Sequence, residues 1–143
     1  MKHYARQNAI RHAEPERARR LALVERLRAS FDSDAARALR NNPWRDDPLA
    51  VDSAGHCYVA SEVLYHACGG AASGLVPVNM RWEGASHWFL RDRATGDVID
   101  PTADQFHVRP TAADYARGRG CGFLTRAPSR RAVQLATHAG ILL

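Results

Sequence analysis

Cysteine, lysine and long apolar runs are scarce in this sequence of 143 residues. The three cysteines form no Cys-x-x-Cys motif and no spacing typical of a disulfide framework, which favours free thiols in a reducing compartment. No apolar run is long enough to cross a bilayer, and the charged segment 1–6 does not resemble a secretory signal. We therefore expect a cytoplasmic protein with no membrane partner.

Arginine supplies nearly all of the positive charge, because Lys2 is the only lysine among 20 basic residues. With 15 acidic residues, the formal net charge is +5, and many of the arginines lie towards the two ends of the chain. This charge permits contact with nucleic acid or an acidic protein. No nucleic-acid-binding motif accompanies it, so a solvated, arginine-rich surface is the favoured interpretation.

The composition is that of an ordinary globular domain, with 45% hydrophobic and 24% charged residues. The length suits one hydrophobic core, and no internal repeat or linker divides the chain. We therefore expect a single domain over 1–143.

Three helices are expected in the first half of the chain. Residues 12–29 have helical apolar spacing, with Pro15 near the start, where its missing N–H costs nothing. A short helix follows at 35–40. The third helix covers 55–67 and ends at the glycine pair that follows it.

The hydrophobic period then changes from that of a helix to that of a strand. Apolar and polar residues alternate over 76–81, and further strands are expected at 86–91 and 97–100, joined by a hairpin loop at 93–96. This pattern predicts an α+β fold, in which helices pack on an antiparallel sheet of three or more strands.

The pattern weakens in the last third of the chain. Residues 115–123 are rich in glycine and are expected to form a loop. A last helix over 128–138 should bury Ala132, Val133 and Ala136 on its inner side.

The register of the expected hairpin sets which side chains share a face. If Asp92 faces Asp97 across the loop, His87 and Asp100 are diagonal neighbours on one face of the sheet. Diagonal Cβ atoms lie about 7–8 Å apart, which lets an imidazole and a carboxylate meet. A carboxylate in this position holds the imidazole tautomer and stabilises its charged form.

Cys57 lies in the first turn of the helix expected at 55–67. The partial positive charge and the free N–H groups of a helix N-terminus stabilise a thiolate and can receive a developing oxyanion. A small buried side chain is the ordinary alternative for a free cysteine. The order of thiol, imidazole and carboxylate along the chain favours Cys57 as a nucleophile, with His87 and Asp100 as its partners.

Other sites have weaker support. The segment 118–122 could cradle a phosphate or offer Cys121 as a nucleophile, but no strand-to-helix context and no helix start accompany it. A zinc site could be assembled on paper, although no metal-ligand spacing supports it, from His56, His66, Cys68, His87 and Cys121. We therefore expect no metal and no cofactor.

Three segments resemble the core of the transglutaminase-like superfamily, within the wider papain-like thiol enzymes: Gly55-His56-Cys57, Ser86-His87-Trp88-Phe89 and Val98-Ile99-Asp100-Pro101-Thr102. In that core Gly-x-Cys begins a helix, the next strand carries His close to Trp, and a further strand ends in Asp-Pro-Thr. The resemblance covers 55–105, the expected catalytic core. It implies a Cys-bearing helix packed on an antiparallel sheet, with Cys57 as nucleophile, His87 as general base and acid, and Asp100 as the orienting carboxylate.

The resemblance implies a thiol-dependent hydrolase, such as a thiol protease, or an acyltransferase that acts on an amide or peptide bond through a thioester. Its substrate would be a protein, a peptide or a small amide. The oligomeric state stays open. The alternative is a catalytically silent binding module of the same fold, which contacts an acidic protein or nucleic acid.

Overall fold

The computed structural model describes the backbone of residues 2–143 and the side chains of residues 14–143. In chain order the elements are α1 (Lys2–Ser30), α2 (Asp34–Arg37), η1 (Trp44–Asp46), α3 (Cys57–Ala67), η2 (Gly70–Ser73), β1 (Leu75–Trp82), β2 (Ala85–Asp92), β3 (Val98–Ile99), η3 (Ala103–Gln105), α4 (Ala112–Ala116), β4 (Arg119–Gly120) and α5 (Arg130–Ala139). The predicted α+β class with an antiparallel sheet is confirmed. No helix in this described part of the chain has both the length and the apolar character needed to cross a bilayer.

The sheet has the strand order β3-β2-β1-β4, and each neighbouring pair is antiparallel. A two-residue turn joins β1 to β2, and both of its residues, Glu83 and Gly84, have the positive φ that such hairpins favour. On the other side of β2, Leu90 pairs with Ile99 of β3. The Asp92 N–H also donates to the Asp97 carbonyl at 2.8 Å. The predicted hairpin register is therefore confirmed.

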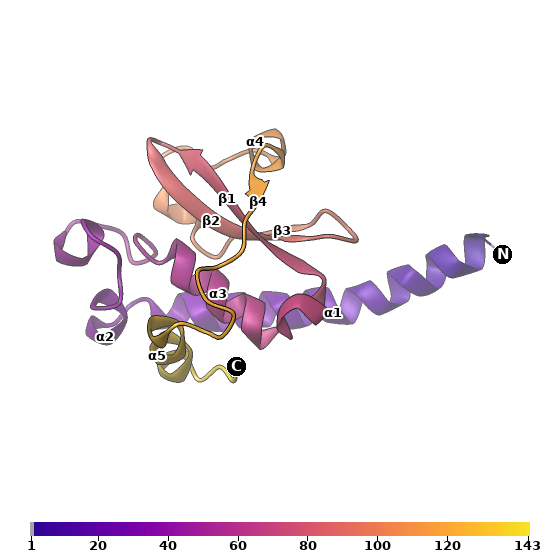
Figure 1. The fold of residues 1–143 in the computed structure, drawn as a ribbon, viewed down its shortest axis with the longest axis horizontal. Helices are drawn as coiled ribbons and strands as arrows, with labels where there is room; N and C mark the ends of the chain where they lie inside the picture. The colour runs from indigo at the N-terminus through magenta and orange to yellow at the C-terminus, as the bar shows by residue number, and fades with distance from the viewer. Residues whose placement is uncertain (1) are drawn as a thin grey trace.

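The two faces of the sheet have different coverings. Figure 1 shows α1, α3 and α5 together on one side of the sheet. They bury a continuous aliphatic core with the sheet, to which the fully buried Leu27, Val63, Leu90 and Leu135 belong. On the opposite face a smaller cluster of Val78, Met80 and Phe89 is partly covered by Tyr115 and Trp82.

The helices of the N-terminal half differ from the prediction in their bounds. Helix α1 begins at Lys2, so Pro15 lies inside it and not near its start. Proline removes one backbone hydrogen bond, but the alanine, arginine and glutamate residues around it are strong helix formers. Helix α2 is shorter than predicted. Helix α3 starts at Cys57 because Gly55, with φ of +80°, is outside helical conformation, and it stops before a left-handed Gly69 as predicted.

The C-terminal third is more ordered than predicted. Segment 115–123 is not simply a loop: it contains the end of α4 and the strand β4, which pairs with Val78 and Asn79 of β1. In α5 the inner residues are Ala132, Leu135 and Ala136, whereas Val133 is 47% exposed. The prediction for Val133 was wrong because the shift of about 100° per residue carries that position away from the buried stripe.

Candidate active site

Cys57 is the first residue of α3, and its side chain is 9% exposed. The turn before it depends on Gly55, whose φ of +80° strains any residue with a side chain. A Cβ there would also lie 3.1 Å from the Cβ atoms of Arg40 and Trp44. This close packing brings the start of α3 against the segment that follows α2.

His87 and Asp100 form the closest polar pair of the site. The His87 Nε2 atom lies 2.6 Å from Asp100 Oδ2, and the two side chains are 1% and 4% exposed. The same carboxylate accepts the Tyr115 hydroxyl at 2.8 Å and the Thr102 N–H at 3.1 Å. A buried carboxylate with three donors is held in one orientation, so it also holds the imidazole ring.

The environment of His87 also sets the charge of its ring. Burial of the ring opposes its protonation, but hydrogen bonds with Asp100 and with Cys57 outweigh burial and raise the pKa of His87 to about 9. Gln105 Nε2 lies 3.5 Å from His87 Nδ1. These interactions favour the imidazolium form of His87, with the Asp100 carboxylate at Nε2 and the Cys57 thiol among the groups that raise the pKa of the ring.

The three side chains meet at the edge of the sheet, although they come from different layers. Helix α3 packs on the face that carries Trp88 and Leu90, while His87 and Phe89 point to the opposite face. Strand β3 ends opposite Leu90, so on that side of β2 no strand of the described chain lies beside His87, whereas β1 pairs with His87 on the other side. Because this edge is open, the first turn of α3 reaches the His87 ring.

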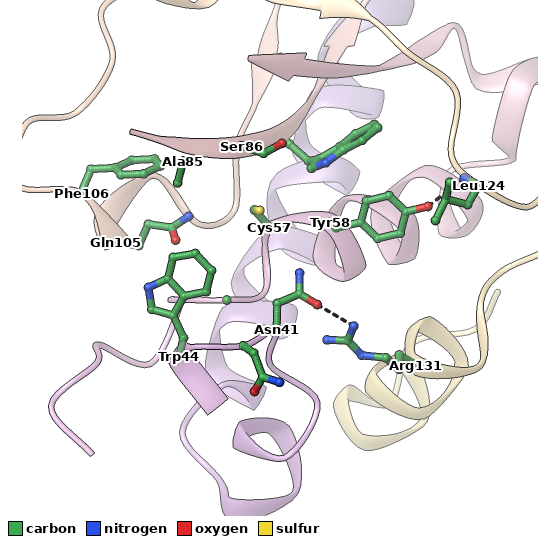
Figure 2. Close-up of a pocket in the computed structure, with 13 residues that line it drawn as sticks. Asn41, Trp44, Cys57, Tyr58, Ala85, Ser86, Gln105, Phe106, Leu124 and Arg131 are labelled. Carbon is green, nitrogen blue, oxygen red and sulfur yellow. Dashed lines mark hydrogen bonds between the residues drawn. The ribbon is translucent and has the colours of Figure 1, made fainter. Parts of the chain in front are cut away.

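A cavity of about 560 Å³ opens over Cys57. Figure 2 shows the Cys57 sulfur at the wall between two groups of lining residues, with Asn41, Trp44 and Arg131 on one side and Ala85 and Phe106 on the other. Four of the residues that line the cavity are aromatic: Trp44, Tyr58, Trp88 and Phe106. Arg131 is the one charged lining residue in the described part of the chain. The cavity therefore has mainly apolar walls and one cationic group, the Arg131 guanidinium.

His56 stands next to Cys57 but has a different environment. It is fully buried and stacks on Phe31, with ring centroids 4.6 Å apart. Burial, together with the charges of Arg40 and Arg131, lowers the pKa of His56 to about 4. Among residues 14–143, neither ring nitrogen of His56 has a hydrogen-bond partner. His56 is therefore a neutral packing residue and not part of the polar site.

The alternative zinc ligands are not brought together. The described residues contain no group of three or more His, Cys, Asp or Glu side chains that could hold a metal ion. Cys68 is buried in the helix-side core, where burial raises its thiol pKa, and Cys121 is exposed. The three free thiols therefore occupy three distinct environments.

Two residues of the site were missed by the sequence analysis. Tyr115 donates to Asp100, and burial together with the Asp100 charge raises the pKa of the Tyr115 hydroxyl. The sequence feature that could have indicated Tyr115 is the capping box of Thr111 and Asp114, because it predicts helix α4, which contains Tyr115. The second is Asn41, which lines the cavity and follows the short helix expected at 35–40, where no motif indicates a functional residue.

The arrangement has the parts needed for nucleophilic attack: a thiol at a helix N-terminus, an imidazolium and a buried carboxylate beside a cavity. The position of Cys57 also places free backbone N–H groups next to the sulfur. No protein-family model, curated protein or solved structure matches this chain.

Proposed function

We propose that the protein is a thiol-dependent hydrolase or acyltransferase of the transglutaminase-like type, acting on an amide or peptide bond. The observation that carries the proposal is the buried His87–Asp100 pair, whose imidazole is influenced by the Cys57 thiol, together with the position of Cys57 at the wall of an open cavity. Each contact has a role in acyl transfer, and a binding module needs none of them.

In the proposed reaction the proton of the Cys57 thiol resides on His87, and the Cys57 thiolate attacks the carbonyl carbon of the substrate, so that a C–S bond forms and the carbonyl oxygen becomes an anion. His87 gives its proton to the leaving amine as the C–N bond breaks, which leaves a thioester on Cys57. Water or an acceptor amine then loses a proton to His87 and attacks the thioester, and the C–S bond breaks. Asp100 keeps the imidazole ring oriented and stabilises its charged form throughout.

The packing of the site also supports the resemblance to the transglutaminase-like core. The Cys-bearing helix α3 packs on an antiparallel sheet, His87 lies on β2, and Asp100 directly follows β3. These are the places that the motif order implies for nucleophile, base and orienting carboxylate.

The reactivity of the three cysteines tests the proposal. Exposure alone makes Cys121 react first, because Cys57 and Cys68 are buried. A thiolate paired with an imidazolium reverses this order at pH 6, where ordinary thiols are protonated. We expect iodoacetamide to modify Cys57 faster than Cys68 and Cys121, as measured by mass spectrometry of the digested protein.

The matched control is His87→Ala, which should slow modification of Cys57 and leave that of Cys121 unchanged. If Cys121 reacts first at pH 6, or if His87→Ala has no effect on Cys57, the proposed nucleophile is wrong.

A further inference from the structure

We propose that the side-chain amide of Asn41 is a catalytic hydrogen-bond donor, which forms an oxyanion hole together with the backbone N–H of Cys57. The inference rests on the proposed function and names a group that the reaction needs. When the Cys57 sulfur attacks a carbonyl, the carbonyl oxygen becomes an anion. Preorganised donors aimed at that oxygen are among the largest contributions to catalysis of acyl transfer.

The orientation of the Asn41 amide is set by Arg131. The Arg131 Nη1 atom donates to Asn41 Oδ1 at 2.6 Å. A guanidinium has donors only, so the amide oxygen must face it and the NH₂ group must face away. Figure 2 shows the Asn41 oxygen on the Arg131 side and the Asn41 nitrogen on the Cys57 side.

The Asn41 NH₂ group is free to bind a substrate. Within the part of the chain whose side chains are described, no acceptor bonds to Nδ2, and Asn41 lines the same cavity as Cys57. Gln105 also lines this cavity, but its NH₂ group already donates to Thr102 Oγ1 at 3.0 Å and faces His87. Asn41 is therefore the better donor of the two.

The backbone holds Asn41 at a constant position relative to Cys57. The Asn41 N–H donates to the Gly55 carbonyl at 3.0 Å, two residues before the nucleophile. A Cβ at Gly55 would lie 3.3 Å from the backbone nitrogen of Asn41, so a side chain at position 55 would crowd the Asn41 backbone. A donor held in this way needs no reorganisation when the oxyanion forms.

Arg131 is tied to α3 as well, and so acts as a positioning residue. It belongs to α5, whose N-cap Ser129 donates its N–H and hydroxyl to the buried Glu62 of α3 at 2.9 and 2.7 Å. Arg131 also donates to the Leu39 carbonyl. Through Glu62, Ser129 and Arg131, helix α3 therefore helps to fix the orientation of the Asn41 amide.

The experiment compares two reactions of Cys57 in the full chain. Acetylation by p-nitrophenyl acetate passes through an oxyanion: the sulfur bonds to the carbonyl carbon, p-nitrophenolate leaves, and a thioester remains. Alkylation by iodoacetamide displaces iodide at a saturated carbon and forms no oxyanion. We expect Asn41→Ala to slow acetylation of Cys57 by about 10²–10³-fold, with alkylation within about twofold of the wild type.

Asn41→Asp separates the donor role from a structural one, because it keeps the acceptor for Arg131 and removes the N–H donor. Acetylation should be at least as slow as in Asn41→Ala, with an unchanged melting temperature. Wild-type acetylation in folded Asn41→Asp would overturn the inference and leave the triad intact. If wild-type Cys57 is acetylated no faster than Cys121, the proposed function itself fails.

A matched pair of arginine variants tests the positioning role. Arg131→Ala frees the Asn41 amide to rotate, and we expect acetylation to slow about tenfold with alkylation unchanged. The neighbouring Arg130 is exposed, and Arg130→Ala should leave both rates as in the wild type. Equal acetylation rates in the two variants would show that Arg131 does not orient Asn41.

Discussion

The two faces of the central sheet differ in what they bury. The face towards α1, α3 and α5 buries an aliphatic core that extends over all three helices. The opposite face has a small apolar cluster and, at its edge, the buried polar side chains of His87 and Asp100 with Tyr115 against them. The aliphatic core and the buried His87–Asp100 pair therefore lie on different faces of one sheet, with Cys57 reaching the pair from the helix side.

The physical reason lies in the energetics of burial. Apolar burial contributes about 25 cal/mol per Å² to stability, so the helix face holds the fold together. A buried ion pair must first lose its hydration, which largely offsets the attraction between its charges. We therefore expect changes on the helix face to alter stability, and changes at the polar edge to alter reactivity.

Asp100→Asn should have the largest effect, and its main effect should be on reactivity. Asparagine keeps an acceptor for the Thr102 N–H, so the turn after β3 survives. It leaves the His87 imidazolium unsupported, and turnover should fall by up to about 10⁴-fold. The melting temperature and the Cys57 alkylation rate are measured together. A folded variant with unchanged alkylation would reduce Asp100 to a turn residue.

Leu90→Ala should act on stability alone, although Leu90 lies on the same strand as His87. Leu90 is fully buried in the helix-side core, and its truncation should lower the free energy of unfolding by about 2–5 kcal/mol. Urea denaturation measures this change. Leu142 is 92% exposed, and Leu142→Ala should change stability by no more than about 0.5 kcal/mol.

At temperatures where Leu90→Ala remains folded, alkylation of Cys57 should match the wild type. A large loss of alkylation in this folded variant would show that the two faces are not separable.

The pH dependence of stability should reveal the polar edge with a smaller effect. The pKa of His87 rises from 6.5 to about 9 on folding, so the folded state binds the proton more tightly. This stabilisation is complete below pH 6.5 and is lost as pH rises to about 9. One pKa unit corresponds to about 1.4 kcal/mol, which bounds the loss at about 3 kcal/mol.

The control is His87→Gln, whose unfolding midpoint should change less than that of the wild type between pH 6 and pH 9.5. Parallel changes in the two proteins would assign the pH dependence to other groups.

The sequence predicted elements that depend on interactions between near neighbours in the chain, and it missed elements that depend on contacts between distant segments. Helix α3 and the β2–β3 register were predictable because glycine stops, alternation and turn geometry act between near neighbours. Strand β4 was missed because its two residues carry no periodicity. Its pairing depends on Gly118, where a Cβ would lie 2.6 Å from the Val78 side chain, and that contact joins distant parts of the chain.

The candidate site divides in the same way. The order of the motifs predicted Cys57, His87 and Asp100 as site residues, and the hairpin register predicted that His87 and Asp100 share one face of the sheet. Only the tertiary structure decided that the thiol reaches His87 around an open sheet edge, that Tyr115 donates to Asp100, and that Arg131 turns the Asn41 amide towards Cys57. Local propensity and strand pairing act over a few residues or one hairpin, whereas these contacts join segments up to 90 positions apart. They come from packing helices on a sheet, and no local pattern encodes that step.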